Sequence, residues 1–364
     1  MKLMEETHPL SNFANAMPYF SEQSLLLDIE TTGFDAKRQP IYLIGTAYRK
    51  EDALKVVLYF AKTPHEEAEI LRAFLGQLAH YHEIITFNGE GFDIPYLQKR
   101  CEKYGIAAEA LAAMTSIDLL RSIRTHKKVL HLDRCSQKSI EAYLGIERED
   151  TYDGGQLIEV YRRYAKQPNE ADESLLLQHN LDDVCGMVRI LPMMGYAKLH
   201  DAALTPDTMD WDEEASLLTA SFFMNVSLPA PVRIHEEAYY LILENSRVKA
   251  ALPLFCGTLN YYFPYPAQYV YLLREGTVVP KVLGASIPAS EKRPAKQEEC
   301  FTVVNGDFLA IDGKLLRRFP RFFEGQRIFR KDYNKGTAYI KTDRATLQAQ
   351  WLAGYVGLLL NAYF

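Results

Sequence analysis

The chain has 364 residues and a formal net charge of −6. This length is enough for two domains of ordinary size. The negative net charge excludes a generally basic nucleic-acid-binding protein, so any recognition of phosphate has to rely on local basic patches or on metal ions.

The cysteines and the N-terminus bound the cellular setting. The five cysteines are scattered and include no C-x-x-C pair, which argues against a disulfide framework and against a zinc cluster. The N-terminal segment MKLMEETHPLSNF contains acidic residues and no apolar core, so it is not typical of a signal peptide. Because no apolar run reaches 18 residues, we expect a cytoplasmic protein that does not associate with membranes.

Strand and helix patterns alternate in residues 1–205. Strands are rich in β-branched and aromatic residues, and helices show apolar side chains at helical spacing. The predicted order is strand 24–29, strand 40–48, strand 54–60, helix 63–81, strand 83–87, helix 93–104, strand 115–120, helix 136–145 and helix 173–194. This order predicts an α/β domain in which helices flank a mixed sheet.

A polar stretch at residues 199–214 indicates a domain boundary, which we place between 205 and 206. Residues 206–364 contain short apolar and aromatic runs that are interrupted by Pro and Gly, and they end in a predicted helix at about 343–362. We expect a second, smaller domain that is β-rich or α+β, of unknown fold, which could assist nucleic-acid binding.

Two carboxylates lie at the end of the first predicted strand, in the sequence SLLLDIETTGF. Asp28 and Glu30 are two residues apart, so on a strand they face the same side, while Ile29 faces the opposite side and is expected to enter the core. Two like charges held this close repel each other unless a positive charge lies between them. The pair therefore indicates a divalent metal site.

A third carboxylate follows the fourth predicted strand, in FNGEGFDIPYL. Asp93 begins a helix after a glycine-containing turn, next to Asn88 and Phe92. An Asp at this place is most often a helix cap. Glycine, however, also allows the backbone to approach a ligand closely, and Phe92 could stack on a base or belong to the core.

The last predicted helix of this domain carries the segment QHNLDDV. His179 and Asp183 are four residues apart, so they lie on one face, one turn apart, whereas Asp182 points about 100° away. Burying these polar groups without partners would be unfavourable, and a metal ion with coordinated water offers a partner.

Together, Asp28-x-Glu30, Asn88 to Asp93, and His179 to Asp183 resemble the three exonuclease motifs of the DEDD (DnaQ-like) superfamily, whose fold is ribonuclease H-like. Within that superfamily the chain is most similar to the YprB-type ribonuclease H-like family. The resemblance covers about residues 20–195. The histidine subclass usually places its His five residues before the last Asp, and the tyrosine subclass uses a spacing of four. The chain departs from this pattern because His179 stands four residues before Asp183, at the place of the tyrosine.

The resemblance implies a 3′–5′ exonuclease that uses two divalent cations, Mg²⁺ or Mn²⁺. Asp28 would bridge both cations, Glu30 would hold the cation nearer the attacking water, Asp93 and Asp183 would complete the ligand sets, and His179 would accept the proton of the water. The terminal nucleotide of a single-stranded DNA or RNA would be held by Thr32, Gly33, Asn88 and Phe92.

A basic segment at residues 314–341 alternates with aromatic side chains. Basic groups and aromatic side chains are what a single-strand-binding surface needs. A solvated basic edge whose aromatic residues belong to the core would give the same sequence pattern. The candidate nucleic-acid-binding residues here are Arg317, Arg318, Arg321, Arg327, Arg330 and Lys331.

Two other functions fit parts of the sequence. A nucleic-acid-binding protein with a ribonuclease H-like fold and little catalysis would not need to hold four carboxylates together. A structural protein could use the same carboxylates as caps and surface pairs, but it would bind no Mn²⁺. The sequence leaves open the choice between DNA and RNA, the choice between exonuclease and endonuclease, and the oligomeric state.

Overall fold

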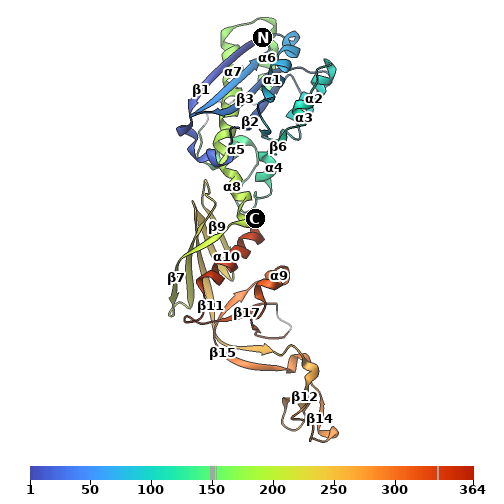
Figure 1. Cartoon of the computed structure of the whole chain (residues 1–364), viewed down its shortest axis with the longest axis vertical. Coiled ribbons are helices and arrows are strands. Elements are labelled where there is room, and N and C mark those ends of the chain that lie inside the picture. The colour runs from blue at the N-terminus through green and yellow to red at the C-terminus, as the bar shows by residue number, and fades with distance from the viewer. Residues whose placement is uncertain (148–151, 153, 334–335) are drawn as a thin grey trace. The chain divides into compact units, whose positions relative to one another are not determined.

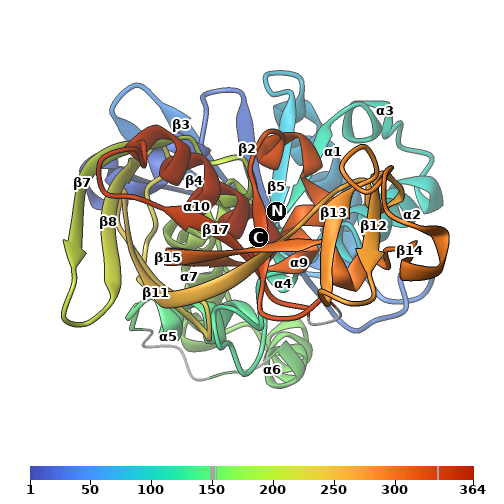
Figure 2. The ribbon, with the colours of Figure 1, turned by 90° about the horizontal axis from the view of Figure 1, so that it is seen from below.

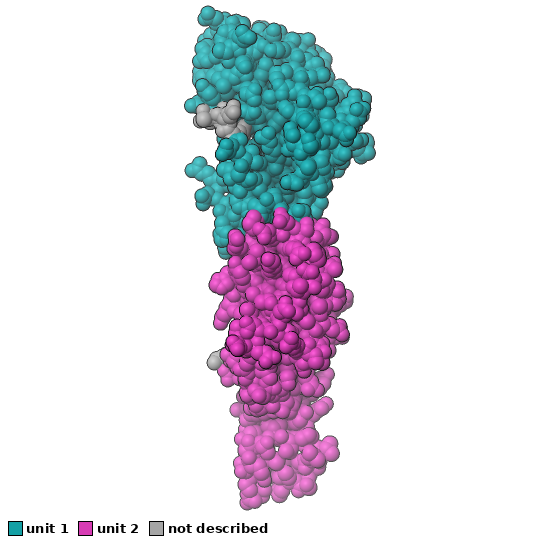
Figure 3. All heavy atoms as spheres, turned by 90° about the vertical axis from the view of Figure 1, so that its left-hand side faces the viewer, with its two compact units in different colours: residues 1–198, 227–230, 364 teal, residues 199–226, 231–363 magenta. Residues whose placement is uncertain are grey.

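The chain forms two compact units. A computed structural model describes residues 1–147, 152, 154–333 and 336–364. The first unit comprises residues 1–198, 227–230 and 364, and the second comprises residues 199–226 and 231–363 (Figure 3).

The first unit is built on a six-stranded mixed sheet with the strand order β1-β4-β3-β2-β5-β6 (Figure 1). Its strands are β1 Lys2–Pro9, β2 Ser24–Thr31, β3 Ile41–Lys50, β4 Ala53–Phe60, β5 Glu83–Thr86 and β6 Thr115–Asp118. Strands β1 to β4 pair antiparallel, whereas β5 pairs parallel to β2 and β6 pairs parallel to β5. The C-terminal ends of β2, β5 and β6 therefore meet at one edge of the sheet.

Helices cover both faces of this sheet. They are α1 Glu67–Leu78, α2 Asp93–Lys103, α3 Glu109–Ala112, α4 Leu119–Arg124, α5 Gln137–Tyr143, α6 Gly154–Lys166, α7 Glu170–Ile190 and α8 Met194–Ala197, with 3₁₀ turns at Leu10–Tyr19, Pro64–Glu66 and Leu191–Met193. Helix α1 packs against β3 and β4, and α7 packs against β2, β3 and β4. Ile29 lies in the same buried cluster as Ile70 and Phe74 of α1, so the odd-numbered side chains of β2 face α1. The expected mixed sheet between helices is confirmed.

Several elements of the first unit were not predicted: strand β1 and the helices α3, α4, α6 and α8, of which α4 begins inside the strand predicted at 115–120. Helix α7 begins earlier than predicted. Strand β1 has an alternating, half-exposed pattern and lies at the sheet edge, where a polar sequence can pair through its backbone alone. Helix α7 begins at Glu170 rather than 173 because the side chain of Asn169 accepts a hydrogen bond from the amide of Asp172 and so caps the helix.

The second unit is rich in antiparallel strands, as expected. Its strands are β7 Leu204–Asp212, β8 Leu217–Met224, β9 Val232–Glu236, β10 Tyr239–Glu244, β11 Arg247–Tyr262, β12 Tyr269–Leu272, β13 Thr277–Pro280, β14 Lys292–Pro294, β15 Phe301–Ile311, β16 Ile328–Arg330 and β17 Ala338–Thr342, and its helices are α9 Gly313–Arg318 and α10 Ala349–Tyr363. The long strand β11 pairs with β8 and β10 through its first half and with β15 through its second half (Figure 2). Strands β12, β13 and β14 form a separate small sheet.

Helix α10 is the most apolar helix of the second unit. It packs against β7 through its buried side chains, which include Leu352, Val356 and Leu359. Among the residues that the structure describes, no helix combines the length and the apolar character needed to cross a bilayer.

A buried ion pair joins α1 and α2 in the first unit. Glu67 and Arg100 are 0% and 1% exposed, and the guanidinium donates to both carboxylate oxygens of Glu67. Glu67 also accepts from the amide of Ile41 (2.8 Å) and from the hydroxyl of Tyr104 (2.8 Å). Arg100 donates to the carbonyl of Ala36 (3.0 Å), so the pair also holds the loop that follows β2.

We expect Arg100→Ala to lower the free energy of unfolding by about 3–5 kcal/mol, because it leaves the Glu67 charge buried without its partner. Arg38→Ala is the matched control, since Arg38 lies in the same loop but is exposed; it should change stability by less than about 0.5 kcal/mol. Both tryptophans, Trp211 and Trp351, lie in the second unit. Tryptophan fluorescence would therefore not report on the first unit, so urea unfolding should be followed by far-ultraviolet circular dichroism. Equal stabilities of the two variants would contradict this role.

Candidate metal centre

The first two carboxylates lie near the C-terminal end of β2. Asp28 and Glu30 point away from the α1 core that contains Ile29, toward the side of the sheet that α7 covers. The pairing of β2 with β3 becomes irregular between Glu30 and Thr31, which marks the end of the regular ladder. Alternation along the strand thus brings both carboxylates to the helix α7.

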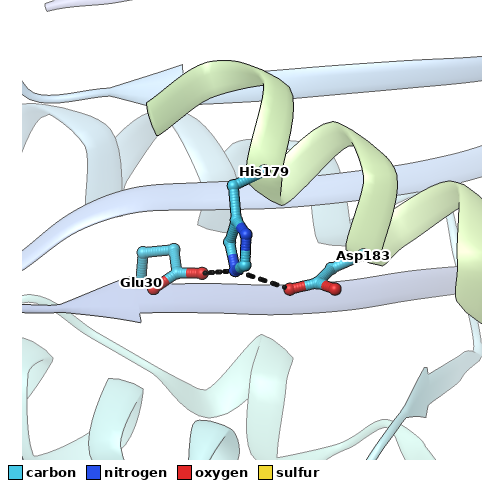
Figure 4. Close-up of side chains that lie close together, drawn as sticks. All are labelled: Glu30, His179 and Asp183. Carbon is cyan, nitrogen blue, oxygen red and sulfur yellow. Dashed lines mark ion pairs between the residues drawn. The ribbon is translucent and has the colours of Figure 1, made fainter. Parts of the chain in front are cut away.

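Glu30, His179 and Asp183 converge in one cluster (Figure 4). The Nε2 atom of His179 lies 3.1 Å from Oδ2 of Asp183 and 3.5 Å from Oε1 of Glu30. One ligand atom from each of the three residues lies within 4.8 Å of the others. His179 and Asp183 reach the same point because they are one helical turn apart.

Asp28 and Asp93 are held at this edge by hydrogen bonds that cross between elements. Oδ2 of Asp28 accepts from Nδ2 of Asn180 on α7 at 2.6 Å. Oδ1 of Asp93 accepts from the backbone amide of Ile29 at 3.1 Å. Asp93 is therefore bound to the strand between Asp28 and Glu30, and it lies one position inside α2, after the cap residue Phe92.

The electrostatics of the cluster favour a bound cation. Burial raises the pKa of Glu30 to about 7, and the nearby charges of Asp183 and Asp93 act in the same direction, against the opposing effects of His179 and Tyr42. Burial also raises the pKa of Asp93 to about 7, although the amide of Ile29 opposes this shift. Carboxylates that burial and mutual repulsion disfavour as anions are stabilised by a divalent ion. The donors are oxygen-rich and include no thiolate, so the site fits Mg²⁺ or Mn²⁺.

The residues that we expect to hold a nucleotide lie in the loops beside this cluster. Thr32 is buried and its amide donates to the carbonyl of Pro40 (3.0 Å). Gly33 has φ = +153°, and a Cβ there would lie 2.2 Å from the side chain of Gln39. Asn88 has φ = +66°, and Phe92 is half-buried with its ring 6.1 Å from that of Phe34.

Two residues near the site are not among those expected from the sequence. Asp118 accepts hydrogen bonds from the amides of Asn88 (3.1 Å) and Glu90 (3.2 Å), so it shapes the loop that leads to Asp93. Its position at the end of the strand next to β5 was the available signal. Phe34 is 88% exposed beside Phe92, and an aromatic side chain directly after Thr-Thr-Gly was the available signal there.

The predicted basic residues of the second unit lie on several short elements. Arg317 and Arg318 are in α9, Arg321 is in a 3₁₀ turn at Pro320–Phe323, and Arg330 is in β16. Three of the basic side chains cover aromatic rings: Arg318 covers Phe319 at 5.0 Å, Arg327 covers Tyr261 at 5.4 Å, and Lys331 covers Phe255 at 4.4 Å.

Residues 25–194 match the family model described as RNase_H superfamily. The match extends from β2 to the end of the 3₁₀ turn before α8, so strand β1 lies outside it, and it ends before residue 199, where the second unit begins. It confirms the ribonuclease H-like fold, while the assignment to the YprB-type family stays a prediction.

Known proteins resemble the chain over part of their length. A DNA polymerase of Pyrococcus glycovorans is 36% identical over an alignment of 93 residues, and the match covers 22% of this chain and 12% of the polymerase. A DNA polymerase of Thermococcus kodakarensis is 33% identical over 93 residues, which are 5% of its length. The chain thus spans a small part of these polymerases.

Solved structures with low overall similarity include two nucleic-acid enzymes. The family B DNA polymerase of Pyrobaculum calidifontis has a TM-score of 0.36 and 12% identity, over 88% of this chain and 54% of that one. Exonuclease I of E. coli in complex with a dT13 oligonucleotide has a TM-score of 0.30 and 13% identity, over 62% of this chain and 55% of that one.

The raised pKa of Glu30 predicts a pH-dependent penalty in the metal-free protein. A buried carboxyl whose pKa is above its unfolded value destabilises the fold once it ionises, so stability should fall between about pH 4.5 and pH 7. We expect Glu30→Gln in EDTA to raise the free energy of unfolding at pH 8 on the order of 2–3 kcal/mol, with little effect at pH 5. Equal effects at the two pH values, measured by chemical denaturation, would refute the burial of this charge.

Proposed function

We propose that the chain is a metal-dependent nuclease that hydrolyses phosphodiester bonds of single-stranded DNA or RNA, acting as a 3′–5′ exonuclease. The convergence of Glu30, His179 and Asp183 at the end of β2 is the observation that carries the proposal. The match of residues 25–194 to the RNase_H superfamily supports it.

Two divalent cations held by Asp28, Glu30, Asp93 and Asp183 would supply the charge that stabilises the attacking and leaving oxygens of an in-line displacement. Asp28 would serve both ions: its Oδ2 accepts a hydrogen bond from Asn180 of α7, and the amide of the next residue, Ile29, donates to Asp93 of α2. Glu30 would orient the attacking water, and the hydroxyl of Tyr42, 3.4 Å from its Oε2, would hold the carboxylate in place.

His179 would accept the proton of the attacking water at Nε2. This atom already lies beside carboxylate oxygens of Glu30 and Asp183, which would stabilise the imidazolium that forms. General-base assistance of this kind is typically worth about 10²–10⁴ in rate. A His one turn from Asp183 thus reaches the same point that the metal ligands define.

Nucleotide binding would use the loops at the same edge. Gly33 and Asn88 lie in the turns that follow β2 and β5, and both have a positive φ. The rings of Phe34 and Phe92 would offer stacking surface to bases, because Phe34 is exposed to solvent.

The decisive assay is incubation of 5′-labelled single-stranded DNA and RNA with the full chain and Mn²⁺. A ladder of shortened 5′-labelled products is expected, and it reports direction and sugar preference together. Glu30→Ala and Asp183→Ala should each abolish the ladder while the circular dichroism spectrum stays unchanged. Full activity of either variant would contradict the assignment, and binding without shortening would favour a nucleic-acid-binding protein.

The basic residues of the second unit would add affinity for the strand. We expect Arg317→Ala, Arg318→Ala and Arg321→Ala in combination to weaken single-strand binding and to flatten its dependence on salt, because each lost phosphate contact reduces counterion release. The matched control replaces Arg233, Lys249 and Lys281, which are exposed elsewhere in the same unit. Equal losses in the two triple variants, measured by fluorescence anisotropy from 50 to about 200 mM salt, would rule out a specific patch.

A further inference from the structure

Asn180 has an environment that stability alone does not explain. Its side chain is 0% exposed, in the middle of α7. Its Oδ1 is buried and has no hydrogen-bond partner among the residues that the structure describes. An unsatisfied buried polar atom typically costs about 1–3 kcal/mol, so an apolar side chain of similar size would suit a purely structural position better.

The other end of the same amide makes a short contact with the metal centre. Nδ2 donates to Oδ2 of Asp28 at 2.6 Å. Asn180 follows His179 directly, so two adjacent residues of α7 serve the site: His179 is the proposed base, and Asn180 contacts the proposed ligand Asp28. A hydrogen bond to a carboxylate oxygen fixes the rotation of the carboxylate, as residues around metal ligands commonly do.

Strand β3 leaves space for this amide. Gly45 is the register partner of Asp28 in the antiparallel pair β2–β3. A Cβ at Gly45 would lie 1.9 Å from Oδ1 of Asn180. The backbone of Gly45 lies outside the left-handed region, so the glycine answers a need for space rather than for an unusual φ.

We propose that Asn180 is a positioning residue that orients the carboxylate of Asp28 for cation binding, and that Gly45 makes the room it needs. This inference rests on the proposed metal-dependent function. Asn180 binds no cation itself, and its amide N–H holds Asp28. The unpaired Oδ1 is tolerated because the amide has to direct its Nδ2 toward Asp28. Loss of such a contact to a ligand typically lowers metal affinity about 10–100-fold.

The test compares metal affinity with stability in Asn180→Leu, which keeps the bulk but cannot donate. Titration calorimetry with Mn²⁺ should show a 10–100-fold weaker affinity. The melting temperature in EDTA should change little, because removal of the unsatisfied oxygen offsets the loss of the hydrogen bond to Asp28. If Asn180 only fills space, the affinity for Mn²⁺ should be unchanged in every variant that folds, and this result would overturn the proposal.

Gly45→Ala supplies an independent arm, because it displaces the Asn180 amide without altering any proposed ligand; it should weaken Mn²⁺ binding as Asn180→Leu does. Gln178→Ala is the matched control, since Gln178 precedes His179 on α7, is exposed and bonds Asp182; its affinity should equal that of the wild type.

The outcomes separate this inference from the function on which it rests. If the wild-type chain binds no Mn²⁺, the proposed function fails. If the wild type binds Mn²⁺, Glu30→Gln loses that binding and Asn180→Leu binds as tightly as the wild type, then only the positioning role of Asn180 is overturned.

Discussion

The cost of holding several carboxylates close together around the C-terminal end of β2 is the constraint on which the candidate site depends. Burial raises the pKa of both Glu30 and Asp93 to about 7, and nearby carboxylates add to each shift: Asp183 and Asp93 at Glu30, and Asp118 at Asp93. The ionised site therefore opposes folding unless a positive charge compensates it. A chain that needed only stability would hold apolar or amide side chains at these places. The arrangement therefore makes sense as a site in which a divalent cation removes the penalty that the fold itself creates.

Three segments distant in sequence build this site, and each is fixed by contacts that do not involve a metal. Strand β2 presents Asp28 and Glu30 on one face, and the amide of Ile29 between them binds Asp93 at the start of α2. Helix α7 lies across the strands and carries His179 and Asp183 to the same edge. The buried pair of Glu67 and Arg100 ties α1 and α2 to the loop after β2.

Much of this site could be predicted from the sequence because its determinants are local. A spacing of two on a strand and a spacing of four on a helix place Asp28 with Glu30, and His179 with Asp183, whatever the rest of the fold does. The contacts of Asn180 and Asp118 depend instead on which strands are neighbours. Gly45 matters only because the register of β2 and β3 sets it opposite Asp28, and strand β1 escaped detection because an edge strand needs no apolar alternation.

Anomalous diffraction from crystals of the full chain grown with Mn²⁺ would locate the cations directly. We expect two anomalous peaks about 4 Å apart, between the carboxylates of Asp28, Glu30, Asp93 and Asp183. Absence of manganese from this cluster at saturating Mn²⁺, with the carboxylates in place, would contradict a two-metal centre at the end of β2.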